Sequence, residues 1–184
     1  MCEDDELLVL FANGDARVAA VLIARHTPRV LSLARHMLND LTEAEDVAQE
    51  TMLRLWRIAG DWRRGEARVS TWLYGVARNL CIDRLRRRRT VGLEGIDEPV
   101  DDTPDVTTTM HSAVRAQALR DALAKLPDRQ REAVVLRHIE GLGNPEIAEI
   151  LHTSTEAVES LTARGKRALS AILLVKKDML GLVS

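Results

Sequence analysis

Residues 144–174, NPEIAEILHTSTEAVESLTARGKRALSAILL, contain the pattern that decides the fold of this 184-residue chain. Asn144 followed by Pro145 is a strong helix start, because a capping side chain precedes a proline at the first helical position. We expect one short helix over 144–152 and, after a brief turn, a longer helix over 153–175. A short helix, a tight turn and a longer helix form the helix-turn-helix arrangement.

The longer helix of this pair has two different faces. Thr153 and Glu156 have capping-box spacing and are expected to open it. One stripe is small or apolar and should pack inward: Val158, Leu161, Gly165, Ala168, Leu169 and Ile172. The opposite side is polar or basic: Glu156, Ser160, Ala163, Arg164 and Arg167. Since the second helix of a helix-turn-helix enters the DNA major groove, this side is predicted to meet phosphates or base edges. A solvated amphipathic helix would show the same pattern.

Apolar residues recur every three to four positions in nearly every window of the chain, which predicts an all-α protein. The N-terminal helices are expected over 6–11, 15–38, 42–59 and 70–89. Thr42 and Glu45 have capping-box spacing, and Ser70 or Thr71 should cap the fourth helix. Pro28 should kink or divide the second helix near Thr27. Two further helices, over 111–126 and 128–140, are expected to precede the helix-turn-helix.

The net charge of −2 conceals a strong segregation of charge along the chain. Residues 78–89 contain six arginines and a single acid, Asp83, whereas 90–110 contain six acids and neither Lys nor Arg. The second segment also lacks apolar periodicity, so it is predicted to be a flexible acidic linker. The chain is therefore expected to form two small helical domains, 1–89 and 111–184, joined by the linker 90–110.

Arginines and tryptophans gather around the fourth predicted helix. Five of the six residues in 84–89 are arginines, which repel one another and favour a polyanionic partner. The loop 60–69 before this helix adds four residues: Trp62, Arg63, Arg64 and Arg68. Aromatic rings beside guanidinium groups suit single-stranded nucleic acid, because unstacked bases rest on the rings while the cations hold the backbone.

Several classes of protein are disfavoured. No run approaches the roughly 18–20 apolar residues that a membrane helix needs, and the first residues, Met-Cys-Glu-Asp-Asp-Glu, are acidic where a signal peptide is basic. We expect a cytoplasmic protein without membrane insertion. Cys2 and Cys81 suggest neither a metal site nor a disulfide framework. No HExxH motif, Walker loop or Cys/His cluster is present, so we expect no metal, no cofactor and no enzymatic activity; a nuclease is the enzymatic alternative. The five histidines are expected at the surface or at caps.

Four motifs together resemble the sigma-70 superfamily, specifically its extracytoplasmic-function branch. They are AEDVAQETMLRLW at 44–56, STWLYGVARN at 70–79, LPDRQREAVVLR at 126–137 and EIAEIL at 146–151. They occur in the family's order and extend the resemblance over roughly residues 5–175. The resemblance implies a four-helix sigma region 2 domain at 1–89 and a helix-turn-helix sigma region 4 domain at 111–184.

The resemblance also implies functions for matching positions in the N-terminal domain. In the family the third helix docks on the clamp coiled coil of the largest polymerase subunit, and four residues look like that surface: Asp46, Gln49, Glu50 and Leu53. Ala44, Ala48, Met52 and Leu55 form the opposed apolar stripe. The following loop and helix melt the −10 promoter element and hold a flipped base. The residues expected there are Trp62, Arg63, Arg64, Arg68, Thr71, Trp72, Asn79, Arg84, Arg86 and Arg87. The Asn79 amide can donate and accept, which suits base reading; Trp72 also fits a core role.

In the C-terminal domain the last helix would read the −35 element as duplex. The residues expected to contact it are Ser160, Ala163, Arg164, Lys166 and Arg167. This chain departs from common relatives at His152, Glu159, Leu161 and Thr162, which puts the family's contact set in doubt. Glu159 could accept a hydrogen bond from a cytosine amino group. His152 stands where glycine is frequent and is expected to need a left-handed backbone.

These expectations define one leading function and one rival. The resemblance implies a sigma factor that directs core RNA polymerase to particular promoters and stabilises the melted −10 element. Its implied partners are core polymerase, through the beta-prime clamp helices and the beta flap, promoter DNA, and an anti-sigma factor that clamps the two domains together. The rival is a helix-turn-helix regulator that binds duplex DNA without polymerase. The rival explains the C-terminal domain but leaves the clamp-like helix and the Trp/Arg loop without a role.

Overall fold

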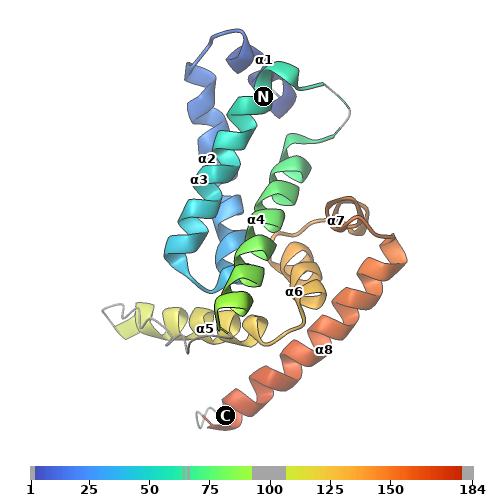
Figure 1. Ribbon diagram of the computed structural model, residues 1–184. Coiled ribbons are helices and arrows are strands. Elements are labelled where there is room, and N and C mark those ends of the chain that lie inside the picture. Colours follow the sequence, from blue (N-terminus) through green and yellow to red (C-terminus); the bar gives the residue numbers. More distant parts are fainter. Residues whose placement is uncertain (1–2, 64, 66, 93–106, 180–184) are drawn as a thin grey trace.

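The computed structural model describes residues 3–63, 65, 67–92 and 107–179 (Figure 1). Over these residues the chain forms α-helices, one 3-10 turn and one π-helical turn, with no strand. The all-α prediction is confirmed. Within this part of the chain no helix combines the length and the apolar character needed to cross a membrane.

Residues 3–92, the N-terminal unit, form an elongated bundle. Its elements are α1 (Asp4–Ala12), α2 (Arg17–Leu38), α3 (Leu41–Ile58), a 3-10 turn (Ala59–Asp61) and α4 (Val69–Gly92). Helices α2 and α3 pack along each other, α4 crosses both, and α1 packs on α2. Large side chains from three helices fill the core, among them Leu22, Leu33, Leu55 and Leu73. The predicted inward stripe of α3 is confirmed, since Ala44, Ala48, Met52 and Leu55 are all buried.

Residues 107–179, the C-terminal unit, contain the helix-turn-helix. The elements are α5 (Thr107–Ala124), α6 (Asp128–Val134), a π-helical turn (Val135–Ile139), α7 (Asn144–Leu151) and α8 (Thr155–Met179). Helix α8 packs on α6, α7 and α5. Helices α6 and α8 approach closely at Gly165, where a Cβ atom would lie 2.6 Å from Val134 Cγ2 and 3.0 Å from the Gln130 carbonyl oxygen. Glycine at this position is therefore a packing requirement.

Four predicted helix caps were misplaced. Helix α4 begins at Val69 and α7 begins at Asn144, so Ser70, Thr71 and Asn144 lie inside their helices, and Gly143 holds the cap position of α7. Asp40, and not Thr42, opens α3, because its Oδ1 accepts a hydrogen bond from the Glu43 amide at 2.9 Å. Ser154, and not Thr153, caps α8, because its Oγ accepts from the Ala157 amide at 3.2 Å. In both segments several residues are good caps, and the chain direction at the helix entrance decides which one is used.

Three further local predictions have clear outcomes. Of the two outcomes predicted at Pro28, a kink or a division, the division does not occur, because α2 runs unbroken through this residue. His152 does have the left-handed backbone, with φ of 50°. His26 is not a surface residue: it is 6% exposed, and its Nε2 lies 2.9 Å from Asp4 Oδ2. Burial lowers the pKa of His26 below its usual value despite the nearby carboxylate.

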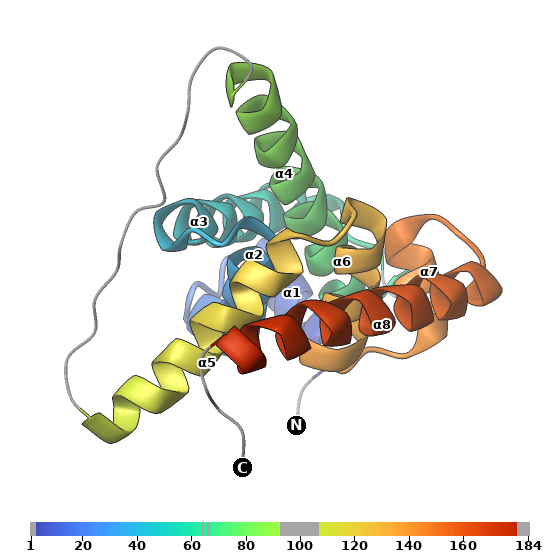
Figure 2. The ribbon, with the colours of Figure 1, turned by 90° about the horizontal axis from the view of Figure 1, so that it is seen from below.

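The two units pack against each other through α2, α4, α5, α7 and the π-helical turn (Figures 1 and 2). One continuous set of buried apolar side chains runs from the N-terminal bundle into the C-terminal unit. Helix α4 ends at Gly92 and α5 begins at Thr107, so both reach into the ends of the predicted linker. The remainder of that linker, 93–106, lies outside the described residues.

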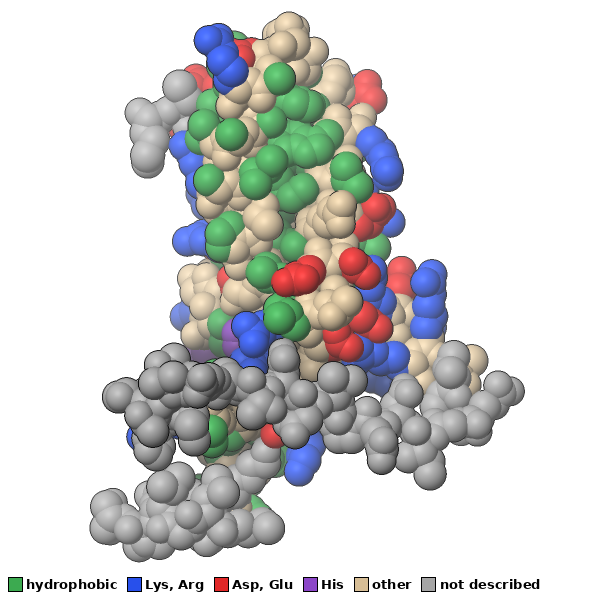
Figure 3. Space-filling model, turned by 90° about the vertical axis from the view of Figure 1, so that its left-hand side faces the viewer, with side chains coloured by type: hydrophobic (Ala, Val, Ile, Leu, Met, Phe, Trp, Pro, Cys, Tyr) green, Lys and Arg blue, Asp and Glu red, His purple; other side chains and the backbone are tan. Residues whose placement is uncertain are grey.

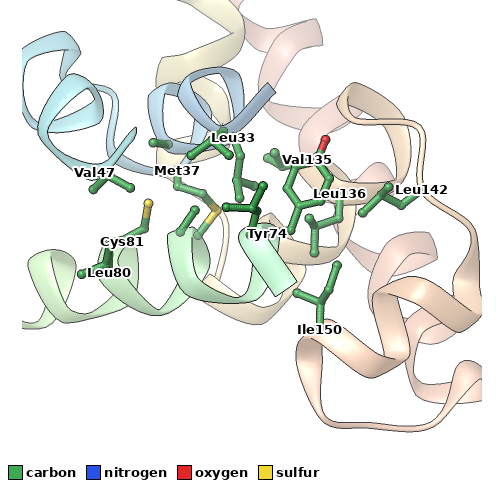
Figure 4. Close-up of a cluster of buried hydrophobic side chains, with 14 of the residues drawn as sticks. Leu33, Met37, Val47, Tyr74, Leu80, Cys81, Val135, Leu136, Leu142 and Ile150 are labelled. Atoms are coloured by element: carbon green, nitrogen blue, oxygen red, sulfur yellow. The ribbon is translucent and has the colours of Figure 1, made fainter. Parts of the chain in front are cut away.

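The cysteine within the described part of the chain is Cys81, at the centre of the N-terminal unit. It is fully buried beside Leu80 on α4 and faces α2 and α3 (Figure 4). Burial raises the pKa of this thiol, which makes it a poor nucleophile in the folded protein. The other cysteine, Cys2, lies outside the described residues.

Candidate nucleic-acid interface and docking surface

The outer face of α3 carries the four residues expected to dock on polymerase. Asp46, Gln49 and Leu53 are exposed, and Glu50 is half-buried. Glu50 Oε1 accepts a hydrogen bond from Arg54 Nε at 2.8 Å, and this bond holds the pKa of the Glu50 carboxyl below its usual range. The four residues share one helix face that is accessible to a partner.

An apolar groove of about 390 Å³ runs beside these residues, between α2 and α3. Its lining residues are Ile23, Thr27, Leu31, Glu45, Ala48, Gln49, Met52, Leu53 and Trp56. Ile23 and Leu53 are 43% and 42% exposed, which is high for large apolar side chains. Figure 3 shows apolar side chains gathered on this face of the bundle. We did not expect α2 to contribute to this groove. The available signal was that α2 carries more apolar residues than a single inward-facing stripe requires.

The tryptophans of the predicted single-strand site pack on each other. The rings of Trp62 and Trp72 meet edge to face, with centroids 6.2 Å apart. The Trp62 indole N–H donates to Asp5 Oδ1 of α1 at 3.2 Å. Both rings are half-buried, so each combines a packing role with an accessible portion. Edge-to-face contact fixes the ring planes, as a preformed surface for a base requires.

The loop and the start of α4 hold the next expected contacts. Arg63 is exposed, whereas Arg64 lies outside the described residues. Arg68 Nη1 binds Glu146 Oε1 of the C-terminal unit at 3.1 Å. Thr71 is 7% exposed, so its side chain faces the protein in this arrangement. Arg68 and Thr71 both border a second pocket of about 390 Å³, whose lining includes Pro145, Glu146 and Glu149 of α7.

Asn79 lies on the exposed side of α4, about two turns beyond Trp72. Its Oδ1 accepts a hydrogen bond from Arg78 Nη1 at 2.9 Å. Arg78 in turn binds the buried Glu132 at 2.9 Å. The bond to Arg78 orients the Asn79 carboxamide, with Oδ1 directed toward the arginine.

The arginines at the end of α4 fall into two classes. Arg86 and Arg87 are exposed, Arg84 is half-buried, and none of the three forms an ion pair with any described residue. Arg88, by contrast, donates to the Leu38 carbonyl at 3.0 Å and binds Asp40 and Glu43, both at 3.0 Å. Three cationic side chains therefore remain for an external polyanion, while Arg88 closes the junction between α2 and α3.

Helix α8 presents all five residues expected at the −35 element. Ser160, Ala163, Arg164, Lys166 and Arg167 are exposed along one side of α8. The Arg164 and Arg167 side chains lie along the helix, each donating weakly to the carbonyl one turn earlier at 3.3 and 3.4 Å. These bonds are long and easily exchanged for phosphate or base contacts.

The residues of α8 and of the turn before it at which this chain departs from common relatives have local roles. Glu159 Oε1 accepts from Asn144 Nδ2 at 3.2 Å, which ties α8 to the start of α7. Leu161 and Thr162 are half-buried and pack toward the rest of the unit. In this unit His152 supplies the left-handed residue that the turn needs. The departures therefore support the helix-turn-helix scaffold.

No group of three or more His, Cys, Asp or Glu side chains is placed to hold a metal ion within residues 3–63, 65, 67–92 and 107–179. The arrangement is suited to binding anionic polymers on two surfaces and a protein partner on a third.

Comparison with known families gives two matches, in the same order as the two units. Residues 22–91 match sigma-70 region 2, and residues 116–169 match sigma-70 region 4. Among curated proteins, the ECF RNA polymerase sigma factor SigM of Mycobacterium tuberculosis is 34% identical over 173 residues, which cover 92% of this chain and 84% of SigM. The ECF RNA polymerase sigma factor SigW of Bacillus subtilis is 31% identical over 168 residues, covering 85% of this chain and 89% of SigW.

Solved structures show the same architecture. CnrH in complex with the cytosolic domain of CnrY superposes with a TM-score of 0.71 at 29% identity, covering 94% of this chain and 97% of that one. The sigma factor RpoE from Bartonella quintana, solved with the anti-sigma factor NepR, has a TM-score of 0.70 at 23% identity and covers 85% of this chain and 96% of its own. The second likeness concerns the fold alone.

Proposed function

The chain belongs to the extracytoplasmic-function family of RNA polymerase sigma factors, and from this premise we propose how its surfaces divide the work of promoter recognition. A sigma factor directs core polymerase to particular promoters. We assign residues 1–89 to a region 2 domain, 111–184 to a region 4 domain, and 90–110 to the linker between them. One observation carries the proposal: two separate cationic surfaces and one acidic and apolar face are all exposed on the same chain.

The outer face of α3 and its neighbouring groove form the polymerase-docking surface in this proposal. Asp46 and Glu50 supply negative charge, and Gln49 supplies an amide. Leu53 supplies an exposed apolar anchor at the edge of the groove. A helix with an apolar stripe and basic flanks, as a clamp helix would provide, fits this combination. An apolar anchor beside a groove is the kind of contact that dominates interface energies.

The loop before α4 and the exposed side of α4 form the −10 surface. Trp62 and Trp72 supply ring faces, Asn79 supplies a base-reading amide, and the cationic loop and helix end hold the backbone. The cations assigned to this surface are Arg63, Arg64, Arg68, Arg84, Arg86 and Arg87. Thr71 also belongs to this surface, and it becomes accessible to DNA when α7 moves away from the start of α4. Stacking and phosphate binding together suit a melted strand and give little hold on intact duplex.

The exposed side of α8 forms the −35 surface. Arg164 is placed for a base edge or a phosphate, Lys166 and Arg167 for phosphates, and Ser160 and Ala163 for close approach of the helix to the groove. The helix-turn-helix fold places such a helix in the major groove. Since duplex is read here and a single strand on α4, the two units act on different forms of DNA.

The same proposal covers the remaining properties of the chain. It acts by binding, with no catalysis and no cofactor, in the cytoplasm, where polymerase and the chromosome are. It is held by an anti-sigma factor when inactive. Support for this last point comes from CnrH, 29% identical to this chain, which was solved in complex with the cytosolic domain of a second protein, CnrY. The rival regulator would need no exposed acidic and apolar face on α3.

Run-off transcription with core polymerase tests the proposal. The full chain should confer initiation at defined start sites on a genomic fragment library, read by sequencing the transcripts. Core polymerase alone should not initiate at these sites. A chain that binds duplex DNA in a band-shift assay, but neither binds core polymerase nor selects start sites, would establish the rival regulator.

The docking surface has its own test. Leu53→Arg should weaken binding to core polymerase by roughly 100-fold, because a charge replaces an apolar anchor. Val114→Arg is the matched control, since Val114 is 54% exposed on α5, away from α3. The two variants should bind single-stranded DNA equally well. Equal loss of polymerase binding in both would remove the groove from the interface.

A further inference from the structure

Four carboxylates of the C-terminal unit contact α4 or the residue just before it. Asp128 binds Arg89 at 2.6 Å, and Glu146 binds Arg68 at 3.1 Å. Between these ends, Glu132 binds Arg78 at 2.9 Å and Glu140 accepts the Tyr74 hydroxyl hydrogen bond at 2.9 Å. We call Asp128, Glu132, Glu140 and Glu146 the carboxylate row. Its partners span nearly the whole length of α4.

The carboxylate row surrounds an apolar contact between the two units. Tyr74 on α4 points toward Val135 and Leu136, with Leu33 and Met37 on its other side (Figure 4). Leu142 and Ile150 complete the cluster from the C-terminal unit, and all these residues are buried. The units are therefore held by a small apolar centre with charge pairs on both sides of it.

The charged partners of the carboxylate row lie on or beside the surface assigned to DNA. Arg68 is in the −10 loop, Arg78 orients Asn79, and Arg89 follows the exposed arginines at the end of α4. Carboxylate and phosphate oxygens accept the same guanidinium hydrogen bonds in the same geometry. While the carboxylate row is in place, these three arginines are neutralised from within the chain.

The closed arrangement cannot hold both promoter elements. The −10 and −35 elements are about 25 base pairs apart, or about 85 Å at about 3.4 Å per base pair. A compact chain of this length is only about 40 Å across. The units must therefore separate before α4 and α8 can occupy their elements on one promoter.

Separation leaves no buried charge without a partner. Arg131, 5% exposed, donates to the Met37 carbonyl across the units at 2.8 Å. It also donates to the Ala124 and Leu126 carbonyls of its own unit, at 2.9 and 3.3 Å. Those two bonds remain after opening, and Glu132 and Arg78 become hydrated. The polar contacts between the units can thus open without unfolding either unit.

We propose that the carboxylate row is an internal mimic of the DNA backbone, which closes the free chain over α4 and competes with single-stranded DNA for Arg68, Arg78 and Arg89. The inference rests on the proposed role of α4 in binding the melted strand. It adds that the free chain blocks part of its own DNA-binding surface before any inhibitor binds. DNA must displace carboxylates, and not merely counterions, to reach Arg68, Arg78 and Arg89.

A pair of variants tests the proposal on the full chain. Asp128→Asn/Glu146→Gln removes the two outer carboxylates of the row, which are only partly buried. Glu45→Gln/Asp46→Asn makes the same change in net charge on the outer face of α3. Binding is measured by anisotropy with a labelled oligo-dT of about 12 nucleotides. The radius of gyration is measured by small-angle X-ray scattering, and circular dichroism checks that each variant is folded.

The row variant should bind oligo-dT about three- to tenfold more tightly than wild type at low salt. Its logarithmic salt dependence should be steeper by about 1.4, because two freed arginines now release counterions on binding. Its radius of gyration should exceed that of wild type, and wild type should expand toward it as salt rises. An affinity, salt slope and radius equal to those of the control variant would overturn the proposal.

A third variant separates this result from failure of the proposed function. Arg86→Ala/Arg87→Ala changes two exposed arginines of α4 that form no ion pair with described residues. If it leaves oligo-dT binding unchanged while the row variant still expands, α4 is not the single-strand site but closure by the carboxylate row stands. If it weakens binding and the row variant stays compact, the single-strand site stands and the mimic is wrong.

Discussion

The arginines at the end of α4 are more numerous than those on α8, and the fold uses the two groups differently. On α4, Arg88 is bound to a carbonyl and two carboxylates of the N-terminal unit, and Arg89 is bound to Asp128. On α8, Arg164 and Arg167 make only long bonds to their own helix. A count of basic residues therefore overstates what α4 offers to DNA and describes α8 well. The carboxylates that face a cationic helix decide how many of its charges are available.

The largest effect should come from the packing of α8. Gly165→Val introduces a β-branched side chain at a position where the Cβ atom alone would lie 2.6 Å from Val134 Cγ2. We expect a loss of about 3 kcal/mol in the unfolding free energy of the C-terminal unit, measured by urea denaturation. Gly60→Val is the control, because nothing lies within 4 Å of a Cβ there. Equal stability of the two variants would show that α6 and α8 can separate at low cost.

The next effect tests the reading of DNA by α8. Arg164→Ala should weaken binding to duplex that contains the −35 element by about 1–3 kcal/mol if the guanidinium reads a base, and should relax the preference at one position. Binding of oligo-dT should not change, since α8 is not part of the single-strand surface. A band-shift titration identical to that of wild type would remove Arg164 from the interface.

Neighbouring arginines of α4 sharpen the comparison directly. Arg88→Ala should lower the unfolding free energy of the N-terminal unit by about 1–2 kcal/mol, because it removes a carbonyl contact and two charge pairs at a half-buried site. Arg87→Ala should leave stability unchanged and weaken oligo-dT binding. Thermal denaturation and anisotropy measure the two effects. If Arg88→Ala instead weakened oligo-dT binding and left stability unchanged, Arg88 would have to leave its partners when DNA binds.

Asn79→Ala should affect selectivity more than affinity. Its amide is the base-reading group proposed on α4, so its loss should reduce the preference for the native −10 sequence over a substituted one. Binding to core polymerase should be retained, because α3 is unaffected. Run-off transcription from the two promoters gives the ratio. An unchanged ratio would assign −10 selectivity to other side chains.

The smallest effect concerns pH. Burial lowers the pKa of His26, and burial likewise lowers the pKa of His36, from the usual value of 6.5. Since the folded chain favours the neutral rings, stability is complete above pH 6.5 and falls as the pH drops through 6.5 toward the lower folded values. The slope is at most about 1.4 kcal/mol per pH unit for each group. His26→Gln/His36→Gln should flatten the curve between pH 6.5 and 5.5, measured by urea denaturation.

Local features of the fold were readable from the sequence, and distant pairings were not. The helix-turn-helix follows from Asn144-Pro145 and the apolar stripe of α8, because each signal lies within a few residues. The partners of Arg88 lie 45 to 50 residues away in the chain, and no local pattern could identify them. The caps at Asp40 and Ser154 were not predicted, because neighbouring residues have similar capping strength. Which of them is used depends on the direction from which the chain enters the helix.

The candidate site divides in the same way. The exposed residues of α3 and α8 follow from helical periodicity alone. The mutual packing of Trp62 and Trp72, and the bond from Trp62 to Asp5, depend on how α1 meets the loop. The groove beside Leu53 depends on the spacing between α2 and α3, which a single sequence does not specify.

The burial of Cys81 gives the chain a built-in reporter. After Cys2→Ser, Cys81 is the single thiol among the 184 residues, and a reagent can reach it only when α4 lifts from α2 and α3. Its alkylation rate, followed by mass spectrometry, would time the breathing of the N-terminal bundle. Parting of the two units with the bundle intact would leave that rate unchanged, so one sulfur atom can distinguish local melting from rearrangement of whole units.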